Sequence, residues 1–356
     1  MKILLLSYSD YNYDGRLRAL IDVFSQIGDL HCFVRKAPMI NNITTCDDNY
    51  FSFIIKSIAF YKKNMPFDLL VLDNRKATIP GLIIHKLFKP SFIIQDSREL
   101  YLFDEVNTFS SKLGCIFERM MSKKSNIVIC ANEYRSIIMK EKYGLKNKPL
   151  VYENLRKLKY DSEQECKEAE TKFKDYVQDE DFHIISTSGC SNKRTTDILV
   201  NNLNKVEKKC RLFLVGDSSK EDLDIIQNII KTNHLNNVFI FGKLNQAELK
   251  YLISKSHLGI VNYGQYDTNN KYCASGKLYE FLYEGIPVVT TTNPPLLEMC
   301  YQYKIGESDD TYYDAINRIM NNYDYYKTNV IKYICDHSIN NNDHLIVESI
   351  LNYLKK

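Results

Sequence analysis

The chain has 356 residues, of which 44% are hydrophobic and 26% charged, and its formal net charge at pH 7 is +3. This length exceeds that of one typical core and predicts two domains. The apolar content predicts folded domains rather than disorder. Because the net charge is small for this length, no strong field for a polyanion follows, and we expect no nucleic-acid partner.

The ten cysteines are scattered, and none belongs to a C-x-x-C pair. That pattern favours reduced thiols in the cytosol over a disulfide framework or a zinc site. The first apolar run, residues 3–6, is too short for a signal peptide and predicts a buried strand. No run approaches the roughly 18 to 20 apolar residues of a membrane span, so we expect a cytoplasmic protein, soluble or peripheral to the membrane.

Short apolar runs alternate with amphipathic segments in the first part of the chain. The expected strands are 3–6, 30–34, 69–72, 92–95 and 127–130. The expected helices are 17–27, 79–87, 112–121 and 134–143. This alternation is typical of a parallel, doubly wound sheet, and we assign residues 1–160 to a first Rossmann-like domain.

A charged stretch without glycine then interrupts the pattern, and residues 161–181 are expected to form a linker with a surface helix at 162–177. The alternation of apolar runs and amphipathic segments then resumes, and it predicts strands at 183–186, 211–215, 238–241, 258–261 and 288–291. It predicts helices at 195–203, 223–232, 246–254 and 277–284. We therefore expect a second domain at 182–310 and a wholly helical tail, 311–356, that packs back towards the first domain.

Two Rossmann-like halves predict a site in the cleft between them, beyond the carboxyl ends of the strands. No strand is followed by the Gly-x-Gly-x-x-Gly pattern of dinucleotide enzymes, which argues against a redox function. In the first half, Gly15 and Arg16 open a helix where a ligand's anionic group can approach. Asp96, Arg98 and Glu99 follow the fourth strand, where a carboxylate can orient a hydroxyl or act as a base. Exposed basic residues at a helix start, and a solvated turn, are the alternatives.

The loop at 186–194 follows the first strand of the second half. It combines small residues, among them Gly189, with the cations Lys193 and Arg194, a composition suited to a diphosphate. Two further loops accompany it, one at Gly216 and one running from Gly242 to Leu244.

The helix expected at 277–284 carries the most informative pattern. Ser275 and Gly276 can cap its start and leave backbone N–H groups for an anion, and a carboxylate, Glu280, lies one turn inside. Gly285 suits the left-handed position that ends a helix. An ordinary capped helix with a solvated Lys277–Glu280 pair is the alternative.

Taken in order, these segments resemble the GT-B glycosyltransferases of the family-4-like group. The second half carries the resemblance in residues 212–217, 238–244, 248–252, 257–261, 275–280 and 285–289. The first half carries it in 14–16, 67–71 and 95–101, so the likeness covers roughly residues 1 to 305. It implies an α/β fold of two Rossmann-like domains whose parallel sheets face each other across a cleft.

The resemblance also implies a transferase for bacterial surface polysaccharide, such as capsule, O-antigen or exopolysaccharide. Such enzymes move a sugar from a nucleotide diphosphate to a glycan or lipid-linked glycan acceptor, usually with retention and without a metal or other cofactor. Glu280 would hold the donor's ribose hydroxyls, and Arg194 would clamp phosphate. The full donor-side set is Gly15, Arg16, Gly189, Lys193, Arg194, Gly216, Gly242, Leu244, Ser275, Gly276, Lys277, Leu278 and Glu280, and the catalytic set is Asp96, Arg98 and Glu99.

Two positions depart from the family pattern. Tyr272 stands where many relatives carry a glutamate that contacts the transferred sugar, which puts the sugar contacts and the stereochemistry in question. Arg98 replaces a histidine and cannot be a general base. A GT-B-fold UDP-N-acetylhexosamine epimerase and a non-catalytic partner of a transferase are the alternatives.

The helix expected within 111–124 has a composition suited to an anionic membrane surface. Its apolar set is Leu113, Ile116, Phe117 and Met120, and its cations are Lys112, Arg119, Lys123 and Lys124. A core-packed helix with a basic outer face is the alternative.

Overall fold

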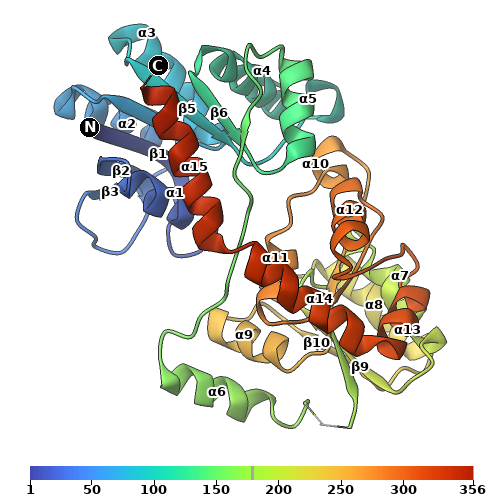
Figure 1. Cartoon of the computed structure of the whole chain (residues 1–356). Helices are drawn as coiled ribbons and strands as arrows, with labels where there is room; N and C mark the ends of the chain where they lie inside the picture. Colours follow the sequence, from blue (N-terminus) through green and yellow to red (C-terminus); the bar gives the residue numbers. More distant parts are fainter. Residues whose placement is uncertain (178–179, 356) are drawn as a thin grey trace. The chain divides into compact units, whose positions relative to one another are not determined.

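The computed structural model describes residues 1–177 and 180–355, and the chain divides into two units. Unit 1 consists of Met1–Asn154, Asp267–Asn269 and Ile339–Lys356, and unit 2 of Leu155–Tyr266 and Asn270–Ser338 (Figure 1). Residues 178–179 of the expected linker and residue 356 of the expected tail lie outside the described residues.

Unit 1 is built on a seven-stranded sheet in the order β3-β2-β1-β4-β5-β6-β7, and every pair of neighbours is parallel. Its strands are β1 (Lys2–Asp10), β2 (Asp29–Lys36), β3 (Ile43–Thr45), β4 (Leu69–Asp73), β5 (Phe92–Ser97), β6 (Ile127–Cys130) and β7 (Leu150–Val151). Successive residues of β1 alternate between two buried clusters, Ile3 with Leu5 and Leu4 with Leu6. The sheet is therefore covered on both faces, as parallel sheets require.

Five of the helices described in unit 1 pack on one of these two faces, and a sixth, Glu133–Tyr143, packs in a separate cluster. They are α1 (Gly15–Ser25), α2 (Tyr50–Asn64), α3 (Thr78–Phe88), α4 (Phe109–Lys124), α5 (Glu133–Tyr143) and α15 (Ile339–Leu354), with short 3-10 turns η1 (Arg75–Ala77) and η2 (Phe103–Glu105). Helices α1 and α15 pack on the face of Ile3 and Leu5, and α2, α3 and α4 on the other. The chain's last helix is thus part of the first unit's core (Figure 1).

Unit 2 is built on a six-stranded parallel sheet in the order β10-β9-β8-β11-β12-β13. Its strands are β8 (Phe182–Ser186), β9 (Cys210–Val215), β10 (Val238–Phe241), β11 (Leu258–Val261), β12 (Val288–Thr290) and β13 (Gly306–Ser308). Its helices are α6 (Glu163–Phe173), α7 (Thr196–Asn201), α8 (Lys220–Thr232), α9 (Gln246–Ser254), α11 (Gly276–Tyr283), α12 (Pro294–Tyr303), α13 (Tyr313–Asn321) and α14 (Tyr323–Asp336), with 3-10 turns η3 (Asn192–Arg194) and η4 (Leu203–Lys205). The short helix α10 (Thr268–Lys271) is divided between the units, since Thr268 and Asn269 belong to unit 1. Successive residues of β8, such as Ile184 and Ile185, belong to two separate buried clusters, so this sheet is also covered on both faces.

The expected tail is three helices with different partners. Ile316 of α13 and Val330 of α14 are buried in the clusters of unit 2, whereas Ile346 and Ile350 of α15 are buried in unit 1. The first segment of unit 1 ends at Asn154, before residue 160, and Leu158 is 1% exposed within the core of unit 2.

Helix α2 is absent from the sequence-based expectation. Its residues Phe51 and Ile55 are exposed while Phe53 and Tyr61 are buried, so apolar residues occur on both faces and hide the helical period. The structure also contains α12 and the short strands β3, β7 and β13, which were not expected.

Candidate functional site

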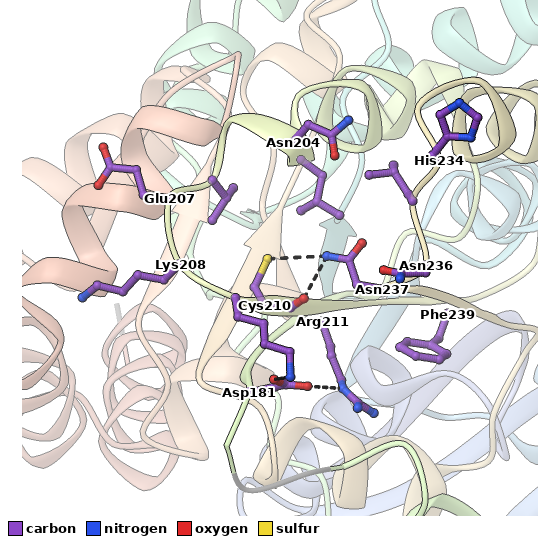
Figure 2. Close-up of a pocket in the computed structure, with 14 residues that line it drawn as sticks. Asp181, Asn204, Glu207, Lys208, Cys210, Arg211, His234, Asn236, Asn237 and Phe239 are labelled. Carbon is purple, nitrogen blue, oxygen red and sulfur yellow. Dashed lines mark hydrogen bonds and ion pairs between the residues drawn. The ribbon is translucent and has the colours of Figure 1, made fainter.

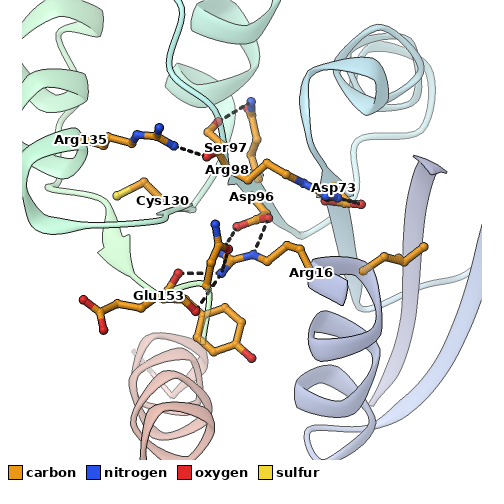
Figure 3. A network of polar contacts seen from close by, with 12 residues as sticks. Arg16, Asp73, Asp96, Ser97, Arg98, Cys130, Arg135 and Glu153 are labelled. Atoms are coloured by element: carbon orange, nitrogen blue, oxygen red, sulfur yellow. Dashed lines mark hydrogen bonds and ion pairs between the residues drawn. The ribbon is translucent and has the colours of Figure 1, made fainter. Parts of the chain in front are cut away.

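Polar side chains of unit 1 converge at the carboxyl ends of its central strands (Figure 3). Arg98, just after β5, donates through Nη1 to both oxygens of Asp14, at 2.8 and 2.7 Å. Its Nη2 donates to both oxygens of Asp73, at 2.6 Å each. Asp73 is the last residue of β4, and Asp14 caps the N-terminus of α1. Arg98 therefore ties the ends of three elements together.

Arg16, in the first turn of α1, makes the second ion pair of this edge. Its Nε and Nη2 donate to the two oxygens of Asp96, at 3.1 and 2.6 Å. Its Nη1 donates to the carbonyl oxygen of Tyr152 at 2.6 Å and to Oδ1 of Asn154 at 3.2 Å. Arg16 thus joins β5 to the segment that follows β7, at Tyr152 and Asn154.

Three carboxylates, Asp14, Asp73 and Asp96, share these two guanidiniums. Burial raises the pKa of Asp73, and the charges of Asp96 and Asp14 add to this effect against the opposing charge of Arg98. Burial also acts on Asp14, but Arg98 and the cap to Leu17 hold the pKa of Asp14 below its usual value. The cluster depends on Arg98 for its stability.

These contacts fix where the expected first-half residues lie. Asp96 is fully buried with both oxygens bound to Arg16, and Arg98 is bound between two aspartates. Glu99 is exposed, and Gly15 is the first residue of α1. Asp73 was not among the sequence candidates, although its signal is a lone carboxylate that closes the apolar run 69–72.

In unit 2, the start of α11 lies beside the loop that follows β8. Ser275 caps the helix, its Oγ accepting from the backbone N–H of Leu278 at 3.4 Å. Lys277 Nζ donates to the carbonyl oxygen of Thr187 at 2.7 Å and to Ser188 Oγ at 3.1 Å. The structure therefore brings the expected loop at 186–194 and the expected helix start, including Gly276, to one place. The side chain of Leu278 is buried in the core.

Glu280 is 2% exposed, and its Oε1 lies 3.0 Å from Nε of Arg156, whose side chain is 45% exposed. Burial raises the pKa of Glu280, while Arg156 and then Lys277 oppose that rise. The alternative of a solvated Lys277–Glu280 pair is wrong, because each side chain has another partner.

The charges near Glu280 are mostly positive. Burial, with the nearby charges of Arg194 and Arg156, lowers the pKa of Lys277 to about 8, although Glu280 opposes the shift. Arg156 and Lys277 thus act on one carboxylate, and Arg194 lies near enough to act on Lys277. Such an excess suits an anionic ligand.

At two of the expected glycines, Gly189 and Gly216, the backbone conformation and the close neighbouring backbone require glycine. Gly189 has φ +66°, and a Cβ there would lie 2.3 Å from the carbonyl oxygen of Asp217. Gly216 has φ +132°, and its Cβ would lie 3.0 Å from the N of Gly189. The loops after β8 and β9 therefore approach each other as only glycine permits. A Cβ at Gly242 would meet nothing within 4 Å.

The remaining residues expected at the donor site of unit 2 are Lys193, Arg194, Leu244 and Tyr272. The guanidinium of Arg194, at the end of η3, lies 4.0 Å from the ring centroid of Tyr263, and Lys193 beside it is exposed. Leu244 is half-buried against the core, and Tyr272 is half-buried after α10.

A cavity of about 460 Å³ lies at the opposite, amino-terminal edge of this sheet (Figure 2). It is lined by the starts of β9 and β10, including Arg211 and Phe239, and by Asp181. The carboxylate of Asp181 pairs with Lys209 at 2.7 Å and with Arg211 at 2.5 Å. None of the sequence-predicted site residues lines it.

No protein-family model and no curated protein sequence matches this chain. Solved structures do match it over nearly its whole length. Anabaena HepE, solved with UDP and glucose, is 16% identical with a TM-score of 0.72, covering 99% of this chain and 100% of HepE. The fold is GT-B. A glycosyltransferase from Rickettsia africae is 15% identical with a TM-score of 0.69, covering 100% of this chain and 99% of its own.

The same GT-B fold is found in a UDP-GlcNAc 2-epimerase from Neisseria meningitidis, solved with UDP-GlcNAc. It is 14% identical with a TM-score of 0.64, covering 99% of this chain and 100% of the epimerase. The expectation of two Rossmann-like domains with parallel sheets is confirmed. None of the helices within 1–177 and 180–355 combines the length and the apolar character that crossing a bilayer requires.

Proposed function

We propose that this protein is a glycosyltransferase that moves a sugar from a nucleotide diphosphate to a glycan or glycolipid acceptor. Its setting would be the assembly of bacterial surface polysaccharide, in the cytoplasm, where its ten free cysteines would stay reduced. The observation that supports it most is the cluster in unit 2, where the capped start of α11 brings Lys277 together with the buried carboxylate of Glu280 and with the charge of Arg194. Solved structures of this fold that bind UDP and UDP-glucose support it.

In the proposed reaction, the bond between the anomeric carbon and the diphosphate oxygen breaks, and a bond to an acceptor hydroxyl oxygen forms. The hydroxyl proton leaves to solvent or to a carboxylate, and negative charge grows on the departing diphosphate. Lys277, Arg194 and the N-terminal dipole of α11 would stabilise that charge, so no resident metal or other cofactor is required. We propose retention of configuration, as in relatives of this group.

Acceptor-side roles are proposed for Asp96, Arg98 and Glu99. Because Asp96 and Arg98 are bound to other side chains of unit 1, their proposed role is to hold the loop after β5 in place. Glu99 is exposed and is our candidate for contact with the acceptor hydroxyl. Of the expected donor set, Gly15 and Arg16 lie at the start of α1 in unit 1, where Arg16 is bound to Asp96 and Tyr152, and their donor role stays a prediction.

We also propose peripheral contact with an anionic membrane through α4, where a lipid-linked acceptor would be reached. This helix buries Cys115, Glu118, Met121 and Ser122, while Phe109, Ile116 and Met120 are exposed. Phe109 is 77% exposed, so Phe109→Ser should reduce co-sedimentation with phosphatidylglycerol vesicles. Phe51→Ser on α2, where Phe51 is 72% exposed, is the matched control. Equal reduction by both variants would contradict this surface.

A panel of nucleotide sugars tests the function directly. At pH 7, below the pKa of about 8 for Lys277, the ammonium is charged and the protein should bind at least one UDP-, GDP-, ADP-, CMP- or dTDP-sugar saturably. Binding should weaken as the pH rises through about 8, because Lys277 then loses the charge that faces the diphosphate. Isothermal titration calorimetry measures both results. An absence of binding across the whole panel would overturn the proposal.

A UDP-N-acetylhexosamine epimerase is the second candidate, because an epimerase shares this fold. It would convert the donor alone, without an acceptor, so analysis of the sugar released after incubation with UDP-GlcNAc distinguishes the two. A non-catalytic partner of a transferase would bind a nucleotide sugar and leave it unchanged with every acceptor.

A further inference from the structure

We propose that Arg156 is a positioning residue for the nucleotide: it holds Glu280 as a carboxylate and leaves one of its oxygens for a ribose hydroxyl. The inference rests on the proposed function and adds to it a residue outside the family motifs and outside the sequence candidates. Its basis is the contact between Arg156 Nε and Glu280 Oε1, at 3.0 Å.

Glu280 needs a fixed positive partner because it is buried. A carboxylate that is 2% exposed is costly to ionise, and a neutral acid would accept a hydrogen bond from a ribose hydroxyl poorly. Lys277, the other cation that acts on Glu280, donates through Nζ to Thr187 and Ser188 and not to Glu280. A guanidinium stays protonated at all relevant pH values, so Arg156 is the dependable counter-charge.

The geometry leaves room for a ligand on the same carboxylate. The contact of Arg156 is with Oε1 of Glu280, and the proposed ribose hydroxyl donates to Oε2. Because the side chain of Arg156 is 45% exposed whereas that of Glu280 is 2% exposed, Arg156 lies on the surface side of the carboxylate. One oxygen is thus held by the protein while the other can accept from a hydroxyl.

The backbone around Arg156 is held by the core of unit 2. Leu155 and Leu158 pack into the same buried cluster as Leu278 and Phe281 of α11. Lys157 Nζ lies 5.9 Å from the ring centroid of Tyr283, also on α11. The segment therefore runs along α11, and Arg156 reaches Glu280 from a fixed position.

The test compares each ribonucleotide with its 2′-deoxy analogue, using UDP with dUDP, GDP with dGDP and ADP with dADP. Because both members of a pair carry the same diphosphate, their affinity ratio isolates the ribose hydroxyl from the titrations of phosphate and Lys277. We expect the wild type to prefer the ribonucleotide by about tenfold or more, since a hydroxyl donating to a carboxylate is a charge-assisted hydrogen bond.

Arg156→Gln should reduce that ratio to about threefold or less, and the loss should deepen as the pH falls, because the pKa of Glu280 rises further without its counter-charge. Arg156→Lys should restore part of the ratio. Arg318→Gln is the matched control, since Arg318 Nε pairs with Glu307 at 3.1 Å and its side chain is 50% exposed. Thermal melting confirms that each variant is folded.

An unchanged ratio and pH profile in Arg156→Gln would overturn this inference and leave the proposed function standing. Failure of the wild type to bind any of the three ribonucleotides would overturn both. An equal fall in affinity for the ribonucleotide and its deoxy analogue would show that Arg156 acts on the diphosphate instead and would likewise contradict the inference.

Discussion

Arg98→Met is expected to lower the free energy of unfolding by about 3–5 kcal/mol, the usual effect of removing one partner from a buried ion pair. The substitution leaves Asp73, which is fully buried, and Asp14 without their shared guanidinium. Chemical denaturation followed by circular dichroism measures the loss. Asp73→Asn added to Arg98→Met should recover part of it, because one of the two orphaned charges is then gone.

The loss of stability in Arg98→Met should also depend on pH. Burial already raises the pKa of Asp73, and loss of Arg98 raises it further. An acid whose folded-state pKa lies above its unfolded value costs stability at higher pH, and that cost declines as the pH falls from the folded-state pKa to the unfolded value. The deficit of Arg98→Met should therefore be largest at neutral pH and shrink in acid.

Arg318→Met is the control for this effect. Its ion pair with Glu307 joins side chains that are 50% and 29% exposed, and such surface pairs contribute only about 0–1 kcal/mol. A deficit for Arg98→Met no larger than that of Arg318→Met, and independent of pH, would contradict the role assigned to the cluster in unit 1.

Glu280→Gln is the second large expected effect, and it acts on the proposed donor site. Removing a charged acceptor should weaken nucleotide binding by about tenfold to hundredfold, which corresponds to about 1.5–3 kcal/mol for a hydrogen bond to a charged group. Donor turnover should fall at least in proportion. Titration calorimetry with the best nucleotide of the panel and an assay of released nucleotide measure both quantities.

Glu307→Gln is the matched control for Glu280→Gln. Glu307 also pairs with the Nε of an arginine in unit 2, at 3.1 Å, but lies at β13. We expect its nucleotide affinity to equal that of the wild type. Unaltered binding and turnover in Glu280→Gln would refute the assignment of α11 as the donor helix.

Much of the architecture follows from local pattern in the sequence. The apolar runs at 69–72 and 258–261 are strands with every residue buried, and the capped helix expected at 277–284 is α11, which spans Gly276–Tyr283. These elements combine a buried run or face with a clear cap or stop, so few local alternatives compete. Helix α2 gave no such signal, because Phe51 and Ile55 place apolar side chains on its exposed face.

The partners within the site could not be predicted in the same way. The carboxylate of Glu280 was identified from its position in α11, but its ion pair with Arg156 joins residues far apart in the chain. Arg98 likewise reaches Asp14 and Asp73 only because parallel strands bring their carboxyl ends to one edge. Sequence periodicity identifies which face a residue occupies, whereas such pairings depend on sheet order and on loop conformation.

A crystal structure of the protein with its best-binding nucleoside diphosphate tests the central claim most directly. We expect the diphosphate at the start of α11, within hydrogen-bond distance of Lys277, and a ribose hydroxyl that donates to the carboxylate of Glu280. A nucleotide bound elsewhere, for example in the cavity lined by Arg211 and Phe239, and making no contact with Glu280, would contradict the proposed donor site.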